Sequence, residues 1–183
     1  LDDLGLGTGI AEGVAVGAGS VWVSRSVGRG QILRLDPVTG EPEHVWNDVT
    51  PYLNFAYGDG SLWVADERAA TPDELKKFPD AAGKGNRVIK FSPDGKILMS
   101  IGKGGAPGDP PESLNEPGDV VLAPNGDILI SEGHSGQIPT PPPGTVGRIS
   151  IFSKDGKFIR SFGKLGSGPG EFRTPHAMVF DQR

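Results

Sequence analysis

Hydrophobic residues recur along the chain in short alternating or continuous runs, separated by segments rich in glycine and proline. Three stretches can be superimposed on one another: 12–46, 51–102 and 117–163. Each stretch contains four apolar runs of strand length, which predicts four strands per repeat. Dipeptides typical of tight hairpin turns separate some of these runs: Asp94-Gly95, Asn125-Gly126 and Asp155-Gly156.

Equivalent positions of the three stretches hold apolar side chains. One position holds Trp22, Trp63 and Leu129, and another holds Ile32, Val88 and Ile149. Four antiparallel strands that recur at a period of roughly 40–45 residues are typical of the blades of a β-propeller. A β-sandwich is the alternative all-β fold, but it does not require its strands to recur in groups of four. We therefore predict an all-β propeller with four-stranded antiparallel blades at about 9–47, 51–102 and 117–163, and the first strand of a fourth blade at 175–183.

The segments between the predicted strands, a to d in each blade, differ in length. The a–b and c–d turns are short, whereas the b–c and d–a links are long and irregular. The long links are 67–85, 103–116, 133–146 and 164–174. Because successive strands alternate in direction, all long links fall on one face of the propeller. Long loops on a rigid scaffold commonly carry function, so we expect a binding site on this long-link face, although family drift in loop length is the alternative.

Several polar residues are expected on the long-link face. His134 follows the second strand of the third repeat, and His176 begins the next predicted strand. Tyr52, Asp66, Glu67 and Glu132 are expected on the same face. Imidazole, phenol and carboxylate groups can hold Zn²⁺ or Ca²⁺ or transfer protons. Histidines at such positions also occur as purely structural residues, and the sequence leaves both interpretations open.

Composition excludes several classes of protein. The 183 residues carry a formal net charge of −5, which argues against a nucleic-acid surface. No apolar run approaches the roughly 20 residues that a membrane-spanning helix needs. Cysteine is absent, so disulfides and thiolate metal ligands are excluded. No phosphate-binding, zinc-protease or serine-hydrolase motif occurs.

Three blades and one strand do not close a propeller ring. An open ring would leave sheet edges unpaired, and such edges readily pair with other strands. We therefore expect residues 1–183 to form a single, incomplete propeller domain. Further blades after Arg183, or self-association with another chain, would complete it.

The sequence also resembles a known family. Segments 115–134, 147–172 and 174–180 resemble NHL-type propellers, in particular the peptidyl-α-hydroxyglycine α-amidating lyase group and its bacterial relatives. The resemblance covers about residues 51–183. It implies a six-bladed propeller with a catalytic zinc and a neighbouring calcium in its channel. It also implies cleavage of a C–N bond that releases a peptide amide and glyoxylate, and an extracytoplasmic setting, secreted or periplasmic.

The resemblance assigns roles to individual residues. Pro175-His176 matches a Pro-His motif of the family, so His176 resembles a zinc ligand. His134 stands where the family has its catalytic tyrosine, and an imidazole there could still transfer a proton. Tyr52 stands where another zinc-binding histidine is expected, and a neutral phenol is a poor replacement.

Three functions remain open at this stage. The first is a module that binds a peptide or small molecule through Tyr52, Asp66 and Glu132 on the long-link face. The second is a zinc-dependent lyase of the amidating type, with His134 as the catalytic residue and His176 as the metal ligand. The third is an assembly protein whose blade edges pair with another chain.

Overall fold

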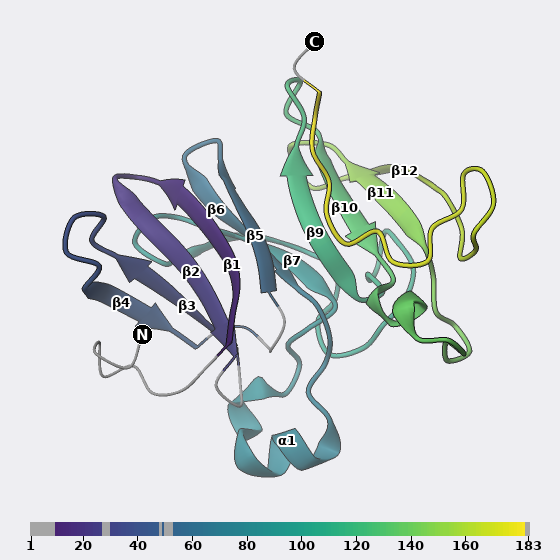
Figure 1. Ribbon diagram of the computed structural model, residues 1–183, viewed down its shortest axis with the longest axis horizontal. Helices are drawn as coiled ribbons and strands as arrows, with labels where there is room; N and C mark the ends of the chain where they lie inside the picture. The colour runs from purple at the N-terminus through teal and green to yellow at the C-terminus, as the bar shows by residue number, and fades with distance from the viewer. Residues whose placement is uncertain (1–9, 27–29, 48, 50–52, 182–183) are drawn as a thin grey trace.

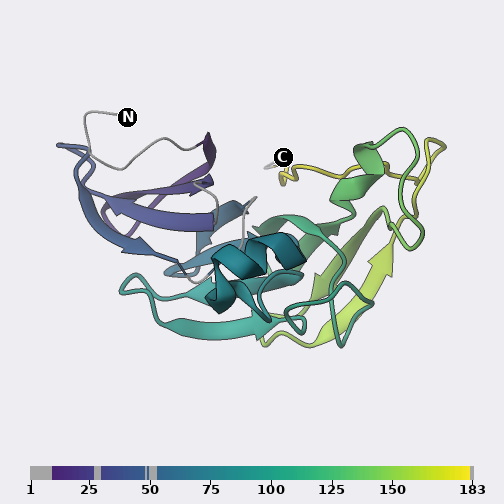
Figure 2. The same ribbon diagram turned by 90° about the horizontal axis from the view of Figure 1, so that it is seen from below.

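The chain forms a partial β-propeller of three four-stranded antiparallel blades, as the sequence predicts. The computed structural model describes residues 10–26, 30–47, 49 and 53–181. In each blade the four strands lie side by side in chain order, and the blades are arranged in an arc (Figures 1 and 2). The first blade contains β1 (Ile10–Gly17), β2 (Ser20–Ser26), β3 (Gly30–Leu35) and β4 (Pro42–Trp46). The second contains β5 (Leu53–Gly58), β6 (Ser61–Asp66), β7 (Arg87–Phe91) and β8 (Ile97–Ile101). The third contains β9 (Pro117–Leu122), β10 (Ile128–Glu132), β11 (Arg148–Phe152) and β12 (Phe158–Phe162).

The strand register confirms the alignment of the three repeats. Trp22 lies opposite Ala15, Trp63 opposite Ala56 and Leu129 opposite Val121. The glycines of the predicted turn dipeptides, Gly95, Gly126 and Gly156, have φ values of 83°, 89° and 77°. Glycine adopts this left-handed backbone without steric cost, which is why these dipeptides end one strand and start the next.

Two hydrophobic cores lie between the blades. The core between the first and second blades contains Trp22 and Ile32 on one side and Phe55, Val64 and Ile89 on the other. The core between the second and third blades contains residues of both blades. The second blade contributes Trp63, Ala65, Val88 and Ile101, and the third contributes Val120, Ile128, Ile130 and Phe152. Each blade therefore buries a face against its neighbour, and this burial drives the stacking.

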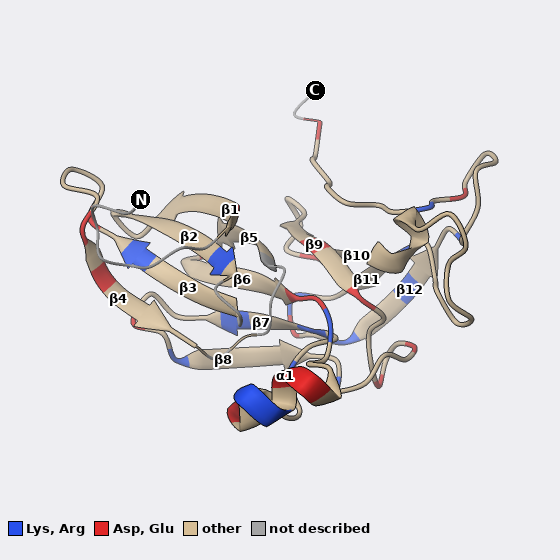
Figure 3. Cartoon of the chain, turned by 60° about the horizontal axis from the view of Figure 1, so that its bottom comes forward, with Lys and Arg blue, Asp and Glu red and all other residues tan. Residues whose placement is uncertain are grey.

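The short turns and the long links lie on opposite faces of the arc. In Figure 1 the a–b turns point upward, and the link that carries helix α1 (Pro72–Lys77) points downward. Thr71 caps this helix, and the Glu74 side chain accepts a hydrogen bond from the Thr71 amide. Acidic residues occupy its first turn and lysines its last, as Figure 3 shows. No helix in the described residues is long and apolar enough to cross a membrane.

The C-terminal segment differs from the expected strand. Residues 174–181 belong to no strand, and the segment runs along the inner side of β9 (Figures 1 and 2). The amide of Met178 donates a 2.7 Å hydrogen bond to Asp119 Oδ2, which holds the segment there. A strand requires backbone hydrogen bonds to a neighbouring strand, whereas this bond runs from the backbone of the segment to a side chain of β9. Side chains of the segment line a shallow pocket together with Leu129 and Ile149 of the third blade.

Candidate functional site on the long-link face

His134 is positioned by a backbone turn directly after β10. Gly133 precedes it with φ 109°, and a Cβ at Gly133 would collide with the carbonyl of Val146. Only glycine therefore fits this position. The turn starts the short 3₁₀ helix η3 (His134–Gln137), so the imidazole leaves the end of the strand at a fixed place.

The carboxylate of Glu67 holds the imidazole of His134. Glu67 Oε2 lies 2.6 Å from His134 Nδ1. Glu67 follows β6 of the second blade and is buried, so this pair joins the b–c links of two neighbouring blades. The hydrogen bond with Glu67 raises the pKa of His134 above its ordinary value, and burial of the ring opposes this. Burial raises the pKa of the Glu67 carboxyl, against the effect of the same hydrogen bond.

His176 lies beside His134, although it comes from the C-terminal segment. The two rings are 5.0 Å apart between centroids, in an edge-on arrangement. Two bonds fix the segment that carries His176: Thr174 Oγ1 donates to the carbonyl of His134 at 3.3 Å, and Met178 is held by Asp119. The structure therefore brings together two of the sequence-predicted site residues, His134 and His176. We call Glu67, His134 and His176 the histidine cluster.

Two further carboxylates adjoin the histidine cluster. Glu116 accepts hydrogen bonds from the amide and the hydroxyl of Ser135, at 2.7 and 2.6 Å, and its charge also raises the pKa of His134. Burial raises the pKa of Asp119, and the charge of His176 acts in the opposite direction. Neither residue is among the sequence-predicted site residues. The signal for Asp119 is a charged residue inside the apolar strand β9.

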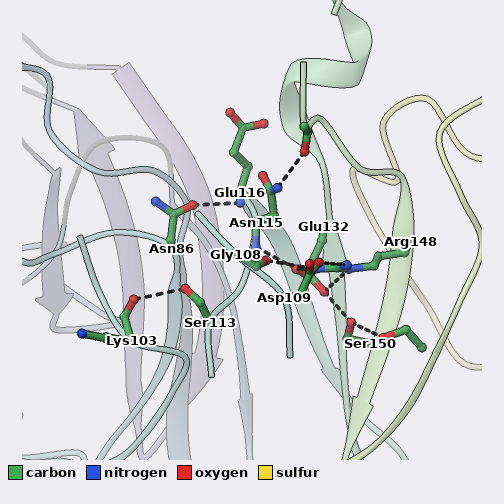
Figure 4. Close-up of polar contacts among 12 residues, drawn as sticks. Asn86, Lys103, Gly108, Asp109, Ser113, Asn115, Glu116, Glu132, Arg148 and Ser150 are labelled. Atoms are coloured by element: carbon green, nitrogen blue, oxygen red, sulfur yellow. Dashed lines mark hydrogen bonds and ion pairs between the residues drawn. The ribbon is translucent and has the colours of Figure 1, made fainter. Parts of the chain in front are cut away.

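Asp66 and Glu132 lie inside the blades and are paired with arginines. Their side chains are 0% and 1% exposed. Arg87 Nε donates to Asp66 Oδ2 at 2.8 Å, and Arg148 Nε and Nη2 donate to the two oxygens of Glu132 at 3.0 and 2.9 Å. Ser150 also donates to Glu132 (Figure 4). The structure therefore places neither carboxylate on the surface of the long-link face.

These buried carboxylates also hold the long links. Asp66 accepts from the amide of Gly85 at 2.9 Å, and Glu132 accepts from the amide of Asn115 at 2.7 Å. Figure 4 shows the second of these networks, in which Arg148 also reaches Asp109. Each carboxylate thus joins the C-terminal end of its strand to a link that borders the histidine cluster. Their role in this structure is to position the links.

Tyr52 and His44 do not contribute to the histidine cluster that the structure describes. Tyr52 lies outside the described residues. His44 lies on β4, the outer strand of the first blade. The centroid of its ring is 4.2 Å from that of Trp46, and it has no contact with the histidine cluster of the second and third blades. His44 therefore takes no part in the histidine cluster.

The histidine cluster supplies part of a zinc site. A catalytic zinc takes three protein ligands, commonly histidines. The cluster offers two imidazoles, and Nδ1 of one is held by Glu67. Within the described ranges, no group of three or more histidine or acidic side chains is arranged to hold a metal ion. The described residues therefore do not form a three-ligand zinc site on their own.

Comparison with known proteins supports the fold and a distant relationship. No protein-family profile matches the chain. The chain is 27% identical over 128 residues to peptidylglycine alpha-amidating monooxygenase of Rattus norvegicus, and 28% identical over 128 residues to the same enzyme of Mus musculus. Each alignment covers 66% of this chain but 10% of the relative, so the chain spans about a tenth of the length of these enzymes.

Among solved structures, the chain is similar to glutaminyl cyclase of Myxococcus xanthus. The TM-score is 0.51 at 13% identity, and the match covers 85% of this chain and 53% of the cyclase. Identity at this level shows a shared fold alone. The similarity to the amidating enzymes therefore agrees with the propeller fold of this chain. It does not by itself show the activity of this chain.

Proposed function

We propose that the chain is a ligand-binding propeller module whose site is the histidine cluster. The observation that carries the proposal is the convergence of Glu67, His134 and His176 from three separate segments, with the two rings 5.0 Å apart. Such a convergence on the loop-bearing face of a rigid scaffold is typical of binding sites. The paired Asp66 and Glu132 support it by holding the links in place.

The chemistry of the cluster favours a ligand with N–H or O–H donors. When the neutral ring of His134 donates from Nδ1 to Glu67, its lone pair lies on Nε2, where it can accept a hydrogen bond. The carboxylates of Glu116 and Asp119 add negative charge nearby. A peptide or a small polar amide supplies donors of this kind, so the proposed ligand class is a peptide or peptide-like small molecule.

Calorimetric titration of the full chain tests the binding proposal. The probe is N-benzoyl-α-hydroxyglycine, and N-benzoylglycine, which lacks the hydroxyl group, is the comparison compound. We expect saturable binding of the hydroxylated probe that His134→Gln and His176→Gln weaken. His44→Gln serves as the control because His44 lies away from the cluster. Equal affinity in all three variants would refute a site at the histidine cluster.

A second candidate function is a lyase of the amidating type, favoured by the similarity over 128 residues to enzymes named for α-amidation. The reaction breaks the C–N bond of a peptidyl-α-hydroxyglycine. The hydroxyl proton leaves as the C=O bond of glyoxylate forms, and the amide nitrogen takes up a proton. In this proposal His134 accepts the hydroxyl proton, with Glu67 orienting its ring. His176 would be a zinc ligand, and zinc would polarise the substrate oxygen.

Glyoxylate release from the same probe separates the two functions. The assay is run with and without added zinc, after binding has been measured. Binding without glyoxylate supports the module, and release of one glyoxylate per probe molecule supports the lyase. Release that persists in His134→Gln would remove His134 from the reaction.

A further inference from the structure

A cavity lies between the second and third blades on the short-turn face, opposite the histidine cluster. Its volume is about 470 Å³, which lies within the range of small-molecule sites. Its apolar walls include Tyr57, Leu122 and Pro124, and Trp63 borders it. Asp59 and Lys154, from the turns of the two blades, lie at its rim.

The repeat explains why this cavity exists. At the interface between the first and second blades, Tyr57 packs over Gly17 and stacks on Trp22, with centroids 6.5 Å apart and ring planes 23° apart. Gly17 has no side chain there, because a Cβ would collide with the Tyr57 ring. An aromatic ring thus fills the space beside the tryptophan at this first interface.

At the next interface leucine replaces the tyrosine. The strand register makes Leu122 the counterpart of Tyr57. Tyr57 directly follows Ala56, which lies opposite Trp63, and Leu122 directly follows Val121, which lies opposite Leu129. Leu122 packs over Gly58, the counterpart of Gly17, and belongs to the core that contains Trp63. Leucine lacks the aromatic ring, so the second interface keeps open the space that an aromatic ring fills at the first.

The charges at the rim favour an anion. Asp59 Oδ2 is held at 2.7 Å by Lys90 Nζ, and that ammonium also lies 5.0 Å from the Trp63 ring centroid. Lys90 is therefore the main partner of the Asp59 charge, and the charge of Lys154 acts on Asp59 as a smaller effect. Lys154 is exposed, its stem crosses Gly126, and no carboxylate in the described ranges lies within ion-pair distance of its ammonium. Its charge can therefore meet a bound carboxylate.

We propose that this cavity binds a small aromatic anion. The ring occupies the space beside Leu122 at the edge of Trp63, which is the equivalent of the place that the Tyr57 ring takes beside Trp22 at the first interface. The carboxylate of the ligand faces Lys154. The site is separate from the histidine cluster and independent of the function proposed for it.

Backbone NMR spectra of the full chain, titrated with 2-naphthoate, test this proposal. Amide shifts at Gly58, Gly126 and Lys154 report the cavity, and amides at Leu129 and Ile149 report the outer face of the third blade. We expect saturable shifts at the first set. The uncharged 2-naphthamide, and Lys154→Gln with 2-naphthoate, should bind up to about fivefold more weakly, the range of a surface ion pair.

Two variants use the repeat itself. Leu122→Tyr fills the cavity with the protein's own ring and should abolish binding, while Leu122→Met keeps the cavity and is the matched control. Tyr57→Leu should create a second site beside Trp22, with new shifts at Gly17. The circular dichroism spectrum of each variant verifies folding. Shifts confined to Leu129 and Ile149, or binding that survives Leu122→Tyr, would overturn the proposal.

Discussion

Oε2 of Glu67 lies 2.6 Å from Nδ1 of His134, so a carboxylate from one blade holds an imidazole from the next. This pair lies on the long-link face, and His176 packs against its histidine. It connects the scaffold to the proposed site, because the same bond that joins two links also orients the ring that faces a ligand. Its protonation therefore affects both stability and binding.

Stability should depend on pH through His134. The pKa of His134 is raised above 6.5 in the folded chain, so the protonated ring is stabilised by folding. This contribution is fully present below pH 6.5 and is lost as the pH rises through the raised value. The raised pKa of Glu67 acts in the same direction, since its contribution is fully present below pH 4.5 and is lost as the pH rises through the raised value. Urea unfolding of the wild type and of His134→Gln should show a larger difference at about pH 5.5 than at about pH 8.5. A difference that grows with pH would contradict the pair.

Removing the buried charge of Glu132 should be strongly destabilising. Glu132→Gln leaves the half-buried guanidinium of Arg148 without its main partner, and breaking a pair with a fully buried carboxylate costs about 3–5 kcal/mol. Asp109→Asn is the matched control, because Asp109 contacts the same arginine but is largely exposed, and it should cost about 1 kcal/mol or less. Chemical denaturation measures both. Equal losses in the two variants would mean that burial does not set the strength of this network.

Trp63 should be a major contributor to the core between the second and third blades. Its side chain is 2% exposed, and truncation of a buried tryptophan costs about 3–5 kcal/mol. Trp63→Ala should therefore lower the free energy of unfolding by that amount. Val38→Ala, at a position that is 90% exposed, should change it by less than about 0.5 kcal/mol. A neutral Trp63→Ala would contradict the observed packing.

Much of the fold could be predicted from the sequence, because blade strands follow local rules. The period of the apolar runs and the glycine turns at Gly95, Gly126 and Gly156 depend on neighbouring residues, and both predictions were confirmed. The strand expected after Pro175 did not form, because a strand also requires backbone hydrogen bonds to a neighbouring strand, which no local pattern specifies. Residues 174–181 packed along β9 instead.

The site was predictable only in part, for a similar reason. Chain position put His134 and His176 on the long-link face, and the structure brings them together. The same position suggested that Asp66 and Glu132 lie on that face. The neighbouring strand supplies Arg87 and Arg148, and these ion pairs allow both carboxylates to be buried. Pairing across strands is not visible in a linear pattern. Glu116 and Asp119 could not be predicted as neighbours of the histidine cluster, because their partners Ser135 and Met178 come from other segments of the chain.

The histidine ring signals in long-range ¹H–¹⁵N NMR spectra test the central claim most directly. The full chain is titrated with N-benzoyl-α-hydroxyglycine, and the rings of His134, His176 and His44 are followed separately. One site built from both rings predicts that His134 and His176 shift together along a single binding curve while His44 stays unchanged. Saturable binding that leaves both rings unmoved, or that moves one without the other, would contradict a ligand site at the histidine cluster.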